Sequence, residues 1–235
     1  MTRPLEYKDS FHAAFSKLDL AIVDCPLSRT EPIEDVEISL AGTDILVFTS
    51  QIAVGLFAKL TSERNIPAYA VGSATANALS NCGFSHVICT GFSGGQMIKA
   101  LNKVGFHSGL YLSAEIVACG IDEAFVGRVR RLKLYRMQPA QAFTTPLLSV
   151  FNKEQGGVIP FFSRRSYEVF ETLLTQYDLR EKCNKFDAIG MSANVFTNDS
   201  TKWRNRLLAD KPTFEGMLSA FNRTFRIAPR PGEAA

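Results

Sequence analysis

The 235-residue sequence lacks the features that mark several common protein classes. No apolar run approaches the ~18 residues that a membrane span needs, and the opening "MTRPLEYKDS" has no apolar signal segment. The five cysteines form no CxxC pair, and the three histidines lie in unrelated segments. We therefore expect a reduced, cytoplasmic protein with no membrane span, disulfide framework or metal site.

The sequence also has almost no excess of charge of either sign. Twenty-six Lys and Arg against 23 Asp and Glu give a net charge of +3. This excess is too small to indicate a nucleic-acid partner, but it is compatible with an acidic small-molecule ligand. The contents of 46% apolar and 21% charged residues are ordinary for a globular protein.

Apolar runs of strand length alternate with amphipathic stretches through most of the chain. This pattern predicts an α/β fold with parallel sheets. The predicted strands are Leu18–Cys25, Asp44–Phe48, Ala68–Val71, His86–Cys89, Leu110–Leu112 and Val129–Tyr135. The predicted helices include Leu5–Lys17, Ser50–Leu60, Ala74–Cys82, Gly95–Lys103 and Ile116–Phe125.

Two polar, proline-containing stretches, "CPLSRTEPIED" and "RMQPAQAFTTP", interrupt this pattern and predict linkers. The piece before the first linker is too short to fold alone, so we expect one domain to be inserted into another. Domain 1 is predicted to comprise residues 1–28 and 140–228, and domain 2 residues 36–133. Residues 29–35 and 134–139 are predicted linker strands, and residues 229–235 a frayed tail.

Hydroxyl side chains follow several of the predicted strands. "LVFTS" in the middle block and "IPFFS" in the last block both end on a serine and lead directly into a helix. A helix N-terminus there offers unpaired N–H groups and a positive dipole end, which suit an anion. The alternative is that each hydroxyl only caps its helix. The candidates are Ser50, Ser73, Thr75, Ser163 and Ser192.

Arginine and tyrosine supply further candidates. Arg164 and Arg165 follow Ser163, and Arg3 lies near the start; each could bind a carboxylate through two hydrogen bonds, or simply be solvated. Tyr135 ends the last strand before the second linker. Its neutral phenol could donate a proton to a ligand, or the ring could simply cover a hinge.

Several motifs, in this order, resemble the uroporphyrinogen-III synthase family. They are "TRP", "PL", "DILVFTSQIAV", "YAVGSATANAL", "LYLSA", "LYRMQP" and "FFSRRS". The resemblance implies two flavodoxin-like parallel-sheet domains joined by a two-stranded linker, with one domain discontinuous. It also implies a monomer without a cofactor.

The resemblance further implies a reaction and a set of site residues. The family closes hydroxymethylbilane, a polycarboxylate, with inversion of ring D and loss of water in heme biosynthesis, with the substrate in the cleft between domains. The resemblance also suggests the upstream deaminase as a second candidate partner. Tyr135 matches the linker tyrosine that assists hydroxyl departure. The matching substrate contacts are Arg3, Thr49, Ser50, Ser73, Thr75, Ser163 and Ser192.

The sequence departs from the family in two places. The family carries an apolar strand before "TRP", so either the true start lies upstream of Met1 or the first domain lacks a strand. "IGMSANVF" also replaces the usual threonine–alanine pair and leaves only Ser192 to supply a hydroxyl. Two other functions stay open: a hinge-type anion-binding protein, and a transferase for a nucleotide sugar or phosphate. Gly72–Thr75 lacks the glycine spacing of a nucleotide loop.

Overall fold

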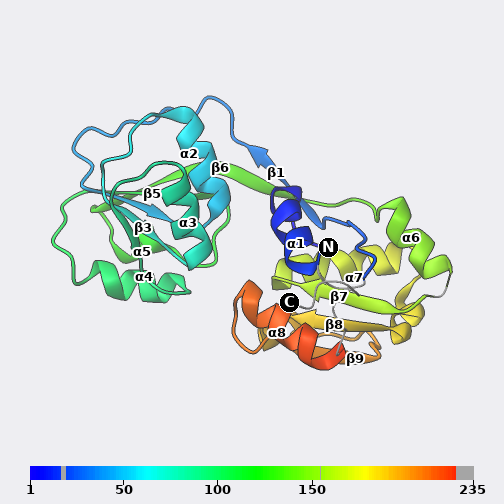
Figure 1. Cartoon of the computed structure of the whole chain (residues 1–235). Coiled ribbons are helices and arrows are strands. Elements are labelled where there is room, and N and C mark those ends of the chain that lie inside the picture. Colours follow the sequence, from blue (N-terminus) through cyan, green and yellow to red (C-terminus); the bar gives the residue numbers. More distant parts are fainter. Residues whose placement is uncertain (17–19, 154, 226–235) are drawn as a thin grey trace. The chain divides into compact units, whose positions relative to one another are not determined.

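The computed structural model describes residues 1–16, 20–153 and 155–225. The chain forms two compact units (Figure 1): unit 1 is Met1–Arg29 with Gln138–Ala235, and unit 2 is Thr30–Met137. The chain passes from one unit to the other in β1 (Ser28–Pro32) and in β6 (Val129–Pro139), which are neighbouring strands. Both units are mixed α/β with mainly parallel sheets, which confirms the predicted class.

Unit 2 is built on a sheet in the order β1-β6-β5-β2-β3-β4, in which β6 to β4 run parallel. Counted from β2, this order is 3-2-1-4-5, whereas the flavodoxin order is 2-1-3-4-5. The hydrophobic pattern predicts strands but does not encode their order. The elements are β2 (Ile45–Phe48), β3 (Ala68–Ala70), β4 (Val87–Cys89), β5 (Gly109–Ala114), α2 (Gln51–Leu60), α3 (Ser73–Asn81), α4 (Gly94–Leu101) and α5 (Ile121–Ala124).

Strand β2 shows why this sheet is covered on both faces. Its four residues are all fully or nearly fully buried, as the continuous apolar run of a central parallel strand requires. Leu46 and Phe48 pack with α2 and α3 residues in one cluster. Ile45 and Val47 pack with α4 and α5 residues in another. The unit is therefore a three-layer sandwich.

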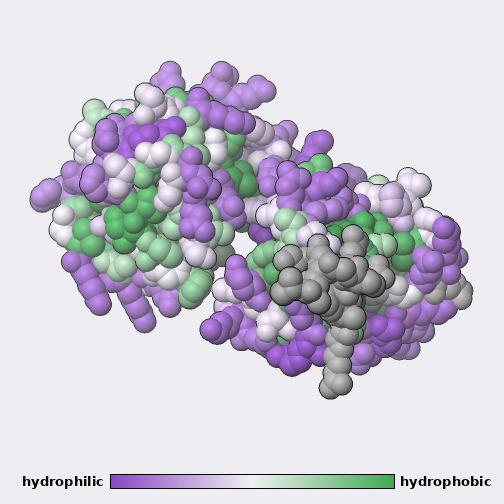
Figure 2. Space-filling view, viewed as in Figure 1, coloured by the Kyte–Doolittle hydropathy of each residue, from purple (hydrophilic) through white to green (hydrophobic). Residues whose placement is uncertain are grey.

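Unit 1 contains a smaller parallel sheet in chain order, β7 (Gly157–Phe161), β8 (Phe186–Gly190) and β9 (Asn205–Leu208). Two aromatic-rich clusters form its core. On the face seen in Figure 2, hydrophilic residues lie along the edges of both units, and hydrophobic residues lie in the middle of the face of unit 2. The remaining elements are α1 (Lys8–Phe15), α6 (Thr145–Asn152), α7 (Arg164–Gln176), α8 (Phe214–Phe225) and the short 3-10 helices η1 (Leu5–Tyr7), η2 (Arg180–Lys185) and η3 (Ala193–Phe196).

The predicted strand Leu18–Cys25 does not form over its described part, residues 20–25. Cys25 N–H donates to the Met1 carbonyl, and the Met1 ammonium donates to the Val23 carbonyl. The Thr2 hydroxyl reaches the Pro160 carbonyl in β7. Beyond this bridge, an apolar cavity of about 540 Å³ is lined both by residues 20–23 and by β7. Residues 20–25 therefore have no long strand to pair with.

The predicted helix Ile116–Phe125 is also wrong over its first half, because α5 contains only Ile121–Ala124. Cys119 lies against Gly94 at the start of α4, so close that a Cβ on Gly94 would meet the cysteine Cβ at 2.5 Å. This packing holds the segment before α5 against the start of α4. A helix beginning at Ile116 would not allow this close contact. The end of the predicted helix Leu5–Lys17 and the predicted tail lie outside the described residues.

A buried carboxylate joins β8 to the segment that enters β9. Asp187 is 2% exposed and accepts hydrogen bonds from Arg204 Nε at 2.9 Å and Asn205 Nδ2 at 2.8 Å; Arg204 Nη2 donates as well. The hydrogen bonds from Arg204 hold the pKa of Asp187 below its ordinary value. Asp187 therefore stabilises the fold above its unfolded-state pKa, and this contribution is lost as the pH falls through the folded-state pKa.

Replacing Arg204 with Ala should lower the free energy of unfolding of unit 1 by about 3 kcal/mol at pH 7, because a buried carboxylate loses its charged partner. The difference from wild type should shrink as the pH falls through the lowered folded-state pKa of Asp187, because the carboxyl group then takes up a proton. Urea unfolding followed by fluorescence of Trp203, the single tryptophan, measures this. A pH-independent loss would contradict the assignment.

Candidate active site

Polar side chains gather at the carboxyl ends of the central strands of unit 2. The strand order reverses between β2 and β5, and ligands of open α/β sheets bind outside the strands at such a point. Thr49 and Ser50 directly follow β2 at this place. Two tyrosines from neighbouring strands meet them: Tyr111 in β5 and Tyr135 in β6.

The two hydroxyls of Thr49 and Ser50 contact different tyrosines. Thr49 Oγ1 lies 3.1 Å from the Tyr111 phenol oxygen, and Ser50 Oγ lies 2.8 Å from the Tyr135 phenol oxygen. The two tyrosines belong to the clusters on opposite faces of the sheet, Tyr135 with Leu46 and Phe48 and Tyr111 with Ile45 and Val47. Burial raises the pKa of Tyr111 above its ordinary value. Tyr135 is 5% exposed.

Ser50 also begins α2. Its backbone is extended, and its side-chain oxygen accepts a hydrogen bond from Ala53 N at 3.1 Å, as an N-cap does. The hydroxyl predicted to contact a ligand is therefore already bonded to two groups of its own unit. Ser50 therefore caps α2 and also contacts Tyr135.

The start of α3 places the other two candidates of unit 2 differently. Gly72 precedes the helix with a φ of 83°, a conformation that favours glycine. Ser73 is the first helical residue and is exposed. Thr75 is 5% exposed and packs into the unit, so only Ser73 presents its hydroxyl to solvent.

Unit 1 presents the corresponding residues at the end of β7. Ser163 caps α7 by accepting from Ser166 N at 3.2 Å. Arg164 pairs with a residue one turn further along the same helix: its Nε lies 2.8 Å from Glu168 Oε1. Ser192 precedes η3 after β8, is exposed and makes no capping hydrogen bond. Ser163, Arg164 and Ser192 therefore lie at the carboxyl ends of adjacent strands.

Arg3 is held at the same end of β7 by aromatic rings. Its guanidinium carbon lies 3.7 Å from the centroid of Tyr7, 4.8 Å from that of Phe162 and 5.9 Å from that of Phe214. Burial lowers the pKa of Arg3 below its ordinary value and raises that of Tyr7. Phe162 is directly followed by Ser163, so these rings position Arg3 beside the strand end at which α7 begins.

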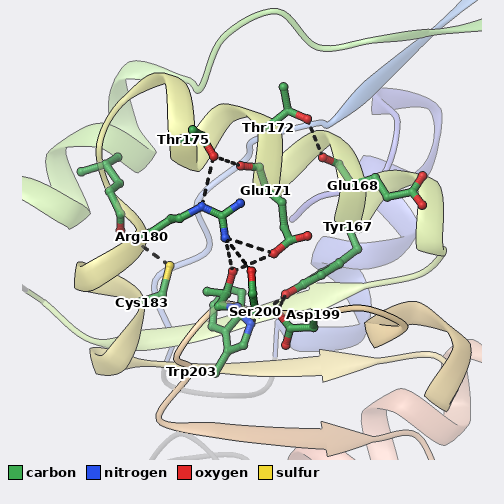
Figure 3. Close-up of polar contacts among 12 residues, drawn as sticks. Tyr167, Glu168, Glu171, Thr172, Thr175, Arg180, Cys183, Asp199, Ser200 and Trp203 are labelled. Carbon is green, nitrogen blue, oxygen red and sulfur yellow. Dashed lines mark hydrogen bonds and ion pairs between the residues drawn. The ribbon is translucent and has the colours of Figure 1, made fainter.

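A polar network fastens the segment after η3 to α7 (Figure 3). The Tyr167 hydroxyl donates to Asp199 Oδ1 and accepts from Trp203 Nε1 at 3.0 Å. Thr201 N also donates to Asp199 Oδ1, at 2.8 Å, and the Thr201 hydroxyl donates to Glu171 Oε1, also at 2.8 Å. Burial raises the pKa of Tyr167 far above its ordinary value. The network fixes the chain that follows Ser192.

The sequence did not indicate every residue of these sites. Tyr111 lies inside the motif "LYLSA", but its alternation with apolar residues predicts only a core position. Phe162 and Phe214 likewise carry no pattern that would associate them with Arg3. In the described part of the chain, no three His, Cys, Asp or Glu side chains form a group that could hold a metal ion. No helix within residues 1–16, 20–153 and 155–225 is long and apolar enough to cross a membrane.

Comparison with protein families gives one match, to the model of uroporphyrinogen-III synthase HemD over residues 9–219. No curated protein sequence matches the chain. The structure is similar to that of the uroporphyrinogen-III synthetase from Helicobacter pylori, with 22% identity, a TM-score of 0.59, and coverage of 84% of this chain and 91% of the other. A mutant uroporphyrinogen III synthase from Thermus thermophilus gives 18% identity, a TM-score of 0.53, and coverage of 96% and 99%.

Replacing Tyr167 with Phe should destabilise unit 1 by about 1–3 kcal/mol, because Asp199 and Trp203 each lose a hydrogen-bond partner inside the unit. Tyr177→Phe is the matched control, since its ring stacks on Phe143 and no described residue hydrogen-bonds its hydroxyl. Urea unfolding and limited proteolysis of residues 197–204 measure the effect. Equal stability of the two variants would show that the network does not hold this segment.

Proposed function

The chain belongs to the uroporphyrinogen-III synthase family of cyclising lyases in heme biosynthesis, and we propose that Tyr135 supplies the proton with which the substrate hydroxyl departs as water. The reaction closes hydroxymethylbilane, an open tetrapyrrole with eight carboxylates, with inversion of its last ring and loss of water. Departure of the hydroxymethyl oxygen as water requires a proton. A phenol is protonated at pH 7 and can donate it.

The observation that supports this role is the place of the phenol. Tyr135 Oη lies 2.8 Å from Ser50 Oγ, at the strand ends where the sheet order of unit 2 reverses. Transfer of the phenol proton to the hydroxymethyl oxygen breaks the C–O bond, and the pyrrole nitrogen electrons form the protonated azafulvene, which leaves Tyr135 as a phenolate. The substituted carbon of the last ring then attacks this electrophile. The spiro intermediate reopens at the bond to the neighbouring ring and recloses inverted through the free α-carbon of the last ring, and the proton that this carbon loses returns to the phenolate.

The substrate carboxylates need binding groups that do not take part in the chemistry. We propose that Arg3, Ser163, Arg164 and Ser192 of unit 1 bind some of them. In unit 2 we propose Ser73 and the N-terminal amides of α2 and α3, because helix N-termini favour anions. Thr49, Ser50 and Thr75 then act mainly within the protein, since their hydroxyls are bonded or buried.

Several wider features belong to the same proposal. We propose that the predicted domains correspond to the two units, and that unit 1 has the flavodoxin-like strand order. The sequential order of β7, β8 and β9, and the bridge from Met1 and Thr2 to β7, support this order. We further propose a cytoplasmic monomer that needs no cofactor, with the upstream deaminase as a candidate partner.

An isomer assay tests the function. Hydroxymethylbilane is generated in situ, and the products are oxidised and separated as uroporphyrin I and III. Wild type should give mainly isomer III, and Tyr135→Phe should lower kcat by about 10²-fold, the lower end of the effect of a general acid. Tyr69→Phe, a buried phenol of the same unit to which no described residue hydrogen-bonds, should leave kcat unchanged.

Two results would reject parts of this proposal. Isomer I alone from a folded protein would reject the synthase function and favour a protein that binds an anion without converting it. Isomer III formed by Tyr135→Phe at the wild-type rate would reject only the role of Tyr135.

Arg3→Gln should raise KM about tenfold and leave kcat within about twofold, because it removes a charge that binds the substrate and the transition state equally. Arg223→Gln is the control: it removes an exposed arginine of the same unit that pairs with Asp210. Initial rates of isomer III formation over a range of substrate concentrations give both constants. An unchanged KM for Arg3→Gln would remove Arg3 from the site.

A further inference from the structure

Ser50 makes two hydrogen bonds, and the donor is fixed in only one of them. The Ala53 N–H can only donate, so Ser50 Oγ accepts at this contact, which spans 3.1 Å. A serine hydroxyl has two acceptor sites and one proton. Between Ser50 Oγ and the Tyr135 phenol oxygen, 2.8 Å apart, either group could donate. The direction of this bond decides whether or not the phenol proton lies on Ser50.

We propose that Ser50 donates to Tyr135 and is thereby the positioning residue for the proton that the phenol delivers. This inference rests on the proposed function. The hydrogen-bond chain runs from the Ala53 amide to Ser50 Oγ and from the Ser50 hydroxyl to Tyr135 Oη. With its oxygen accepting from Ser50, the phenol directs its own proton away from Ser50. In the opposite arrangement, the phenol proton would be held on Ser50.

Three physical effects favour this direction. A hydroxyl that already accepts a hydrogen bond becomes a stronger donor, because consecutive bonds polarise one another. The chain begins at the N-terminus of α2, the positive end of a helix dipole. When Tyr135 gives up its proton, the negative charge forms on the oxygen at the end of this chain. Donors that are already in place then stabilise that charge without rearranging.

Neighbouring groups show that the arrangement at Ser50 is specific. Ser93 caps α4 in the same way, by accepting from Gln96 N at 3.3 Å, but no phenol contacts its oxygen among the described residues. Thr49 contacts the Tyr111 phenol but caps no helix. Among the described serine caps with a side-chain hydrogen bond, Ser50 alone joins a helix amide to a tyrosine. Ser93 is therefore a matched control for the loss of a cap alone.

The test measures isomer III formation in five single variants, Tyr135→Phe among them, and one double variant. Ser50→Ala removes the cap and the donor, and should lower kcat about tenfold with KM within about twofold. Ser50→Gly should lower kcat equally, because glycine caps a helix nearly as well as serine but cannot donate. Ser50→Thr retains the hydroxyl and should keep kcat within about threefold. Ser93→Ala should keep the wild-type kcat.

The double variant Ser50→Ala/Tyr135→Phe decides whether Ser50 acts through the phenol. In the Tyr135→Phe background, Ser50→Ala should change kcat by less than about twofold, because nothing remains to be positioned. Multiplicative losses, or wild-type kcat in both Ser50→Ala and Ser50→Gly, would overturn the inference. Wild-type kcat in Tyr135→Phe would instead reject the proposed role of the tyrosine, so the two failures are distinguishable.

Discussion

The dipeptide Thr49–Ser50 is the constraint on which the candidate site of unit 2 depends. One hydroxyl contacts Tyr111 and the other contacts Tyr135, and these tyrosines belong to the core clusters on opposite faces of the sheet. These tyrosines belong to β5 and β6, so the carboxyl ends of three strands are joined by side-chain contacts as well as by the sheet. The same serine begins α2, which ties the helix N-terminus to the phenol. Ser50 therefore both caps a helix of the fold and contacts the proposed catalytic phenol.

Unit 1 fixes its polar groups by a different means. Arg3 is held by aromatic faces, which position its guanidinium beside the end of β7. The segment after Ser192 is held by the network of Tyr167, Asp199 and Thr201. Both devices place rigid packing directly behind a strand end. A flexible polycarboxylate can then be bound by groups whose conformational entropy has already been lost on folding.

The sequence predicted the strand ends better than the contacts made there. A buried apolar run followed by a hydroxyl and an amphipathic helix is a local pattern, so Ser50 and Ser163 were found at the starts of α2 and α7. The tyrosine partners of Thr49 and Ser50 depend on the strand order, which the pattern does not contain. Thr75 was a candidate because of its position, but the side of the helix on which it lies buries it. The helix predicted from Ile116 failed for the same reason, since packing on Gly94 overrides local propensity.

The small net charge of +3 follows from what the proposed reaction demands. Substrate and product carry the same eight carboxylates, so strong fixed charges would bind both equally and slow product release without lowering the barrier. Helix amides and hydroxyls, together with Arg3 and Arg164, give orientation with less binding energy. The azafulvene is already reactive, so the protein has to choose which carbon attacks it more than it has to activate either partner. In the proposed reaction, a hydrogen-bonded phenol that directs one proton meets that demand together with rigid strand ends that bind carboxylates.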